Sequence, residues 1–150
     1  MSAVVGGLGL VLTTALMSIA VTLPRVGGPP AVTAGAAPWS SHLDAVDLAL
    51  QTNDVPAALK AWHAAYGAAL ASRRWDGFAD AGDAYLRVAS AAGAAGAPRA
   101  RDLYLSALFR ARDAGSRDGA LRVAAAFAGL GDREVATQAR RIARRLPATP

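Results

Sequence analysis

The run of 21 consecutive uncharged residues from Ala3 to Leu23 constrains this chain more than any other sequence feature. As an α-helix the run is roughly 31 Å long, which matches the ~30 Å hydrocarbon core of a bilayer. The run contains no ionisable side chain, so it predicts an anchor or a packing element rather than a proton relay or an ion pathway. We therefore expect residues 1–24 to form a single transmembrane helix.

A cleaved secretory signal is the alternative interpretation of this run. Residues 34–36, Ala-Gly-Ala, offer a peptidase the small-x-small site that it requires, and cleavage there would release the rest of the chain. A signal peptide normally carries basic residues before its apolar stretch, whereas only Met1 and Ser2 precede this one. The uncleaved anchor is the favoured interpretation.

Three small residues in the run, Gly6, Gly9 and Thr13, recur on one helical face and predict close packing against another membrane helix. Arg25 is the only basic residue near either end of the run, which favours the cytoplasmic side for the domain that follows. Residues 25–39 are rich in Pro, Gly and Ala and lack helical periodicity. They predict a flexible linker that holds the domain about 20 Å from the bilayer.

The remaining residues predict an all-α domain. The chain contains 39 Ala residues, the strongest helix formers, and no run of alternating β-branched or aromatic residues predicts a strand. Caps, prolines and glycines divide the segment into six amphipathic helices. We expect them over residues 40–53, 56–72, 74–91, 98–113, 117–129 and 133–146, with Ser116 and Asp132 capping the last two.

A degenerate internal repeat runs through the even-numbered helices of this set. Each contains a pair of Ala residues with a large or long side chain between them: Ala58, Trp62 and Ala65; Ala100, Tyr104 and Ala107; Ala136, Arg140 and Ala143. The pattern of the second expected helix recurs 42 residues later in the fourth, and that of the fourth recurs 36 residues later in the sixth.

Here the chain resembles the tetratricopeptide repeat family, whose unit of about 34 residues has small residues at its eighth, twentieth and twenty-seventh positions. The stretches 81–85 and 120–132 carry the resemblance best, whereas the longer intervals and Arg140, at an aromatic position, depart from it. The resemblance covers residues 40–147 and implies three stacked antiparallel hairpins. A compact helical bundle is the alternative.

The sequence contains few of the residue types that usually act in catalysis. There is no Cys, one Glu and one Lys. His42 lies near two carboxylates without zinc-type spacing, and Ser116 lacks the spacing of a nucleophile turn. We expect no enzyme activity, no bound metal and no cofactor.

The family resemblance implies that the first helix of each hairpin lines a concave groove for a partner. Its exposed positions would form a mildly acidic, partly apolar surface suited to a basic or amphipathic segment. The residues concerned are Asp47, Leu50, Asp76, Asp83, Leu86, Asp118 and Leu121.

A second candidate surface is basic, since Arg140, Arg141, Arg144 and Arg145 crowd the last helix. A terminal helix needs a polar outer face and arginines favour a helix C-terminus, which is the ordinary explanation. Beside a bilayer, anionic lipid headgroups are the nearest phosphates. The domain carries 11 acidic residues against 15 basic ones, and no nucleic-acid motif accompanies the arginines. Nucleic acid is therefore not expected as a partner.

These features together predict a non-enzymatic, single-span membrane protein that binds other subunits of a membrane complex through a helical-repeat domain. The alternative function is a secreted or periplasmic peptide-binding module, released by cleavage near Ala36.

Overall fold

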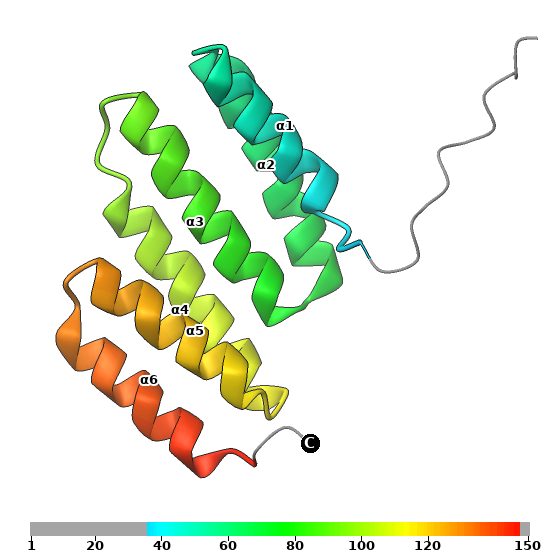
Figure 1. Cartoon of the computed structure of the whole chain (residues 1–150). Coiled ribbons are helices and arrows are strands. Elements are labelled where there is room, and N and C mark those ends of the chain that lie inside the picture. The colour runs from blue at the N-terminus through cyan, green and yellow to red at the C-terminus, as the bar shows by residue number, and fades with distance from the viewer. Residues whose placement is uncertain (1–35, 148–150) are drawn as a thin grey trace, which may run out of the picture. The chain divides into compact units, whose positions relative to one another are not determined.

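A computed structural model describes residues 36–147 of the 150-residue chain (Figure 1). The expected membrane helix, with Gly6, Gly9 and Thr13, lies outside the described residues, as does the linker up to residue 35. None of the described helices combines the length and the apolar character that crossing a bilayer requires.

The described residues form six α-helices and no strand, so the all-α prediction is confirmed for them. Connections of two to five residues join consecutive helices, and their ends agree closely with the expected ones. In chain order the helices are α1 (Ser40–Gln51), α2 (Val55–Ser72), α3 (Trp75–Ala91), α4 (Ala97–Asp113), α5 (Arg117–Gly129) and α6 (Arg133–Arg145).

Side-chain caps start two of these helices. Asp54 Oδ1 accepts a hydrogen bond from the Ala57 amide at 2.9 Å, which begins α2. Ser116 Oγ accepts from the Gly119 amide at 3.0 Å, which begins α5 as the sequence predicts. Asp132 stands at the N-cap position of α6 but makes no capping bond. Its carboxylate instead accepts from Arg101 of α4 at 2.6 Å, because the tertiary fold brings a guanidinium closer than the helix amides.

The helices form two layers. Each helix packs against its neighbours in the chain, and α3 also contacts both α1 and α5, so these three form one layer. The second layer contains α2, α4 and α6, of which α4 contacts α6. Among the described helices, the backbones of α2 and α4 stay apart, and the Arg99 guanidinium of α4 reaches across to α2, 5.2 Å from the Tyr66 ring centroid. The first two hairpins are therefore closer together in the odd layer (α1, α3, α5) than in the even layer (α2, α4, α6).

Repeated alanines allow this close approach. The six Ala residues of the sequence repeat are all completely buried, at the same place in α2, α4 and α6. Because a methyl group is small, the neighbouring helix can come close, and the large residue between each pair then fills the space beside it. Trp62 and Tyr104 do so with exposed fractions of 2% each. Six helices paired in this order are consistent with a helical-repeat fold.

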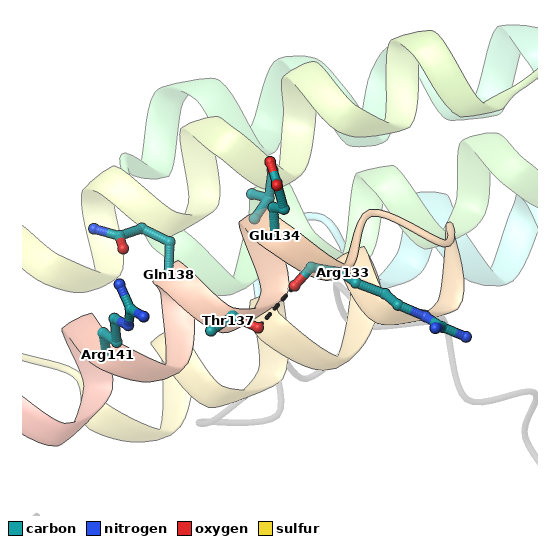
Figure 2. Close-up of a pocket in the computed structure, with 6 residues that line it drawn as sticks. Arg133, Glu134, Thr137, Gln138 and Arg141 are labelled. Carbon is teal, nitrogen blue, oxygen red and sulfur yellow. Dashed lines mark hydrogen bonds between the residues drawn. The ribbon is translucent and has the colours of Figure 1, made fainter.

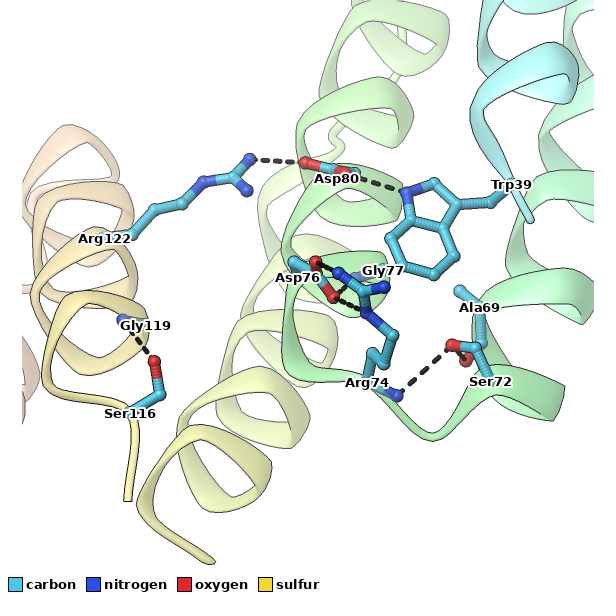
Figure 3. A network of polar contacts seen from close by, with 10 residues as sticks. All are labelled: Trp39, Ala69, Ser72, Arg74, Asp76, Gly77, Asp80, Ser116, Gly119 and Arg122. Atoms are coloured by element: carbon cyan, nitrogen blue, oxygen red, sulfur yellow. Dashed lines mark hydrogen bonds and ion pairs between the residues drawn. The ribbon is translucent and has the colours of Figure 1, made fainter. Parts of the chain in front are cut away.

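Trp39 belongs to the folded domain, although the sequence places it in the linker. Its side chain is only 1% exposed and packs against Ala65 and Ala69 of α2. The indole Nε1 donates a hydrogen bond to Asp80 Oδ2 at 2.8 Å (Figure 3). The chain therefore enters the domain at a defined place, beside α2 and α3.

Candidate interaction surfaces

A polar network ties the odd layer together across α3 and α5 (Figure 3). One terminal guanidinium nitrogen of Arg122 donates to Asp80 Oδ1 at 2.6 Å and to Asp83 Oδ2 at 3.0 Å. The other oxygen of Asp80 accepts from the Trp39 indole. The Tyr104 hydroxyl donates to Asp83 Oδ1 at 2.6 Å. We call these five residues the odd-layer network; they join all three hairpins.

The electrostatics of this network keep its arginine charged and its tyrosine neutral. Burial lowers the pKa of Arg122, but the hydrogen bonds and charges of Asp80 and Asp83 outweigh it and raise the pKa above its usual value. Burial raises the pKa of Tyr104, and the hydrogen bond to Asp83 raises it further. At neutral pH Arg122 therefore stays positively charged and Tyr104 stays neutral, and Arg122 partly balances the negative charge of the two carboxylates.

The other carboxylates of the predicted groove on α1 and α3 also have partners. Asp47 of α1 pairs with Arg87 of α3 at 2.9 Å. The sequence spacing allows Arg87 to pair with Asp83 within its own helix, but the structure directs Arg87 to α1 instead. Asp76 accepts from Arg74 Nε at 3.1 Å. Within the described residues, Asp47, Asp76 and Asp83 each use their charge in an intramolecular ion pair.

The apolar groove candidates divide into two kinds. Leu50 and Leu86 are half-buried and pack against the core, so little of either side chain faces solvent. Leu121 is 42% exposed, and Asp118, one turn earlier on α5, is exposed as well. The structure therefore leaves Asp118 and Leu121 as the part of the predicted groove most open to a partner.

Charge is divided unequally between the two layers. The helices of the odd layer contain six carboxylates and three arginines. The helices of the even layer contain three carboxylates and ten lysines and arginines. Since the layers form opposite sides of the stack, one side is mildly acidic and the other strongly basic. This segregation is not visible in the net charge alone.

The basic character is strongest on α6. Arg140, Arg141, Arg144 and Arg145 are all exposed, and no ion pair within residues 36–147 involves any of them. A shallow pocket lies on the same helix, between side chains shown in Figure 2. Its lining residues, Arg133, Glu134, Val135, Thr137, Gln138 and Arg141, all come from α6. It is therefore the open face of one helix rather than a cleft between elements.

Metal ligation finds no support in the part of the chain that the structure describes, where no group of three His, Asp or Glu side chains converges. His42 lies on α1 and His63 on α2, where the His63 ring packs edge-on against the Trp62 ring with the centroids 4.9 Å apart. Every buried side-chain nitrogen and oxygen among the described residues has a hydrogen-bond partner.

Comparison with known proteins identifies no relative. No protein-family model matches the sequence, and neither a curated protein nor a solved structure matches the chain. The arguments for function below therefore depend on the residues and their arrangement.

Proposed function

We propose that this chain is a non-enzymatic, membrane-anchored scaffold or accessory subunit that binds other proteins of a membrane complex through a tetratricopeptide-like domain. The observation that carries the proposal is the two-layer stack of hairpins, in which buried Ala pairs recur at equivalent places in α2, α4 and α6. Such stacks present long, fixed surfaces built from several helices, which suits them to protein binding. The apolar run 3–23 supplies the anchor in this proposal.

The state of the polar groups supports a binding role over a catalytic one. Catalytic groups work with pKa values near the working pH. Here the pKa of Tyr104 and that of Arg122 both move away from neutrality, and the two side chains hold the hairpins in register through Asp80 and Asp83. These residues fix the shape of the surface that a partner meets.

The partner contact is proposed for the α5 end of the odd layer. Leu121 is 42% exposed and Asp118 lies one turn away. An exposed leucine beside a carboxylate fits an amphipathic helix or segment that carries a basic residue. The acidic balance of the odd layer favours the same kind of partner.

Affinity purification of the full chain from mild detergent tests this proposal. Stoichiometric membrane-protein partners are expected with the unmodified chain, and Leu121→Arg should lose them. Leu59→Arg is the matched control, because Leu59 of α2 is similarly exposed, at 39%, but lies in the even layer. Recovery of a strictly monomeric chain would contradict the proposal. Sequencing of the mature N-terminus is the second test, since a start near Ala37 would remove the anchor and favour the released peptide-binding module.

A further inference from the structure

The last hairpin breaks the pattern by which each hairpin binds the next. Trp62 and Tyr66 of α2 contact α3. The ring centroids of Trp62 and Tyr85 lie 4.8 Å apart, and those of Tyr66 and Phe78 lie 6.3 Å apart. One hairpin later, Tyr104 and Leu108 occupy the equivalent buried places in α4. The ring centroids of Tyr104 and of Phe127 in α5 lie 5.9 Å apart. These positions form the face of each hairpin that receives its successor.

In α6 the equivalent positions carry Arg140 and Arg144, and both are exposed. A guanidinium at these places prevents a further hairpin from stacking, because it would be buried without a partner. At these positions the exposed end of the stack is therefore basic, whereas α2 and α4 carry aromatic or aliphatic side chains there. Ending the stack needs a polar residue there, but any polar residue would serve.

The positive charge of α6 exceeds what ending the stack requires. At 100° per residue, the five arginines of α6 fall within an arc of about 140° on one side of the helix. Attraction to the helix dipole accounts for arginines in the last turn. It does not account for Arg133, which stands in the first turn, where positive charge is unfavourable. Glu134 is the only carboxylate on α6.

We propose that the arginine face of α6 (Arg133, Arg140, Arg141, Arg144 and Arg145) docks on the anionic headgroups of the bilayer that holds the apolar run. The inference rests on the proposed membrane anchor in one respect, that the anchor keeps the bilayer within reach. Charge complementarity selects the occupant, since guanidinium groups bind phosphate in a bidentate manner. Because Trp39 belongs to the domain, the linker expected from the sequence ends by residue 38, and a random coil of that length spans about 20 Å, enough for the domain to reach the surface. Docking there would fix the domain's orientation and leave the acidic odd layer free for a protein partner.

The chain contains no Cys, so a single introduced Cys can report where α6 lies. Thr137 is exposed in the middle of the arginine arc, and its hydroxyl bonds only to the Arg133 carbonyl of its own helix (Figure 2). Full-length Thr137→Cys, carrying a nitroxide label, is reconstituted in vesicles of phosphatidylcholine alone or of an equal mixture with phosphatidylglycerol. Label accessibility to a water-soluble and to a lipid-soluble relaxation agent is then measured. Ala45→Cys, exposed on α1 of the odd layer, is the control site.

The label at residue 137 should become shielded from the water-soluble agent only in vesicles that contain phosphatidylglycerol, and high salt should reverse the shielding. The label at residue 45 should stay accessible. Each arginine in contact contributes about a fivefold factor to the docking equilibrium constant, so R140Q/R141Q/R144Q/R145Q should reduce that constant by a factor of about 10² or more. The variant K60Q/R117Q removes charges from other helices and should dock as before.

Two outcomes would overturn the inference. Residue 137 could remain equally accessible in both vesicles, which would leave α6 as no more than a polar end of the stack. Alternatively, the four arginines could be needed for binding duplex DNA while vesicle docking stays unchanged. Co-flotation with vesicles of phosphatidylcholine alone tests the anchor separately, because that lipid has no net charge. Flotation without shielding refutes the docking alone, and shielding without such flotation refutes the anchor alone.

Discussion

Replacement of Gly82 by Ala tests whether the hairpins pack as closely as the structure indicates. Gly82 is buried in the middle of α3, and a Cβ added there would lie 2.6 Å from Cε1 of Tyr104 in α4. Real Cβ atoms do not approach other atoms so closely, so either the ring or the helix must move. The ring has little freedom, because it is 2% exposed and its hydroxyl is bonded to Asp83. Phe127 of α5 lies against it from the next hairpin.

The expected change is the balance of two opposing effects. Exchange of Gly for Ala inside a helix stabilises by about 1 kcal/mol, because the unfolded chain loses conformational freedom. Overpacking of a well-packed core costs about 1–3 kcal/mol. A contact of 2.6 Å with a fixed ring belongs in the upper half of that range. Gly82→Ala should therefore lower the free energy of unfolding by about 1–2 kcal/mol.

Gly67 provides a matched control in α2. It also lies inside a helix, but an added Cβ would have no atom within 4 Å. Gly67→Ala should stabilise the protein by about 1 kcal/mol, so the two variants should differ in sign. Thermal unfolding of the full chain in mild detergent, followed by circular dichroism, measures the difference. Each kcal/mol shifts Tm by about 4 °C for a domain of this size. Equal or greater stability of Gly82→Ala would refute the close contact.

Three further predictions concern the odd-layer network. Tyr104→Phe should lower the free energy of unfolding by about 1–3 kcal/mol at pH 8, because the hydrogen bond to Asp83 is lost. Since the folded-state pKa of Tyr104 is raised, the extra stability of the wild type should hold below pH ~10 and then fall by about 1.4 kcal/mol per pH unit. An equal difference in unfolding free energy between the two proteins in urea titrations at pH 8 and pH 11 would contradict this. Arg122→Met should lower the free energy of unfolding by about 1 kcal/mol, a modest value because the ion pairs are partly exposed to solvent. High salt should reduce the difference in stability between the variant and the wild type. A double-mutant cycle with Asp80→Asn that gave no coupling energy would refute the pairing. Trp39→Ala should lower the free energy of unfolding by about 3–5 kcal/mol, and Trp39→Phe should lower it much less. Equal melting temperatures for Trp39→Ala and the wild type would instead place Trp39 in the linker.

The helices could be predicted from the sequence because their signals act over a few residues. Pro56 and Pro98 open α2 and α4 within the first turn, where a missing amide costs nothing. Ser116 caps α5 through the amide three residues on. Gly93 and Gly131, both at positive φ, mark the ends of α3 and α5. Such signals need no knowledge of the tertiary fold.

The alanine repeat predicted which positions are buried, because a helix with small residues at fixed spacing has one face that a neighbour can approach. All six repeated Ala residues are buried as that pattern requires. The predicted groove was harder to judge, because a list of exposed positions does not say what each side chain contacts. Leu50 and Leu86 pack against the core, and the groove carboxylates of α1 and α3 pair with arginines. Asp118 and Leu121 are exposed and take part in no ion pair within the described residues.

By itself the sequence determined the all-α class of the described domain, the ends of its helices and the faces that alanine opens to neighbours, since each follows from residues within a turn or two. Only the tertiary structure decided the partners of the charged and indole groups. Arg87 meets Asp47 instead of Asp83, Arg122 meets two carboxylates about 40 residues away, and the indole of residue 39 enters the core. The reason is physical: a long side chain pairs with the opposite charge that the packed helices bring within about 3 Å, and each of these pairs forms only when two neighbouring hairpins have stacked.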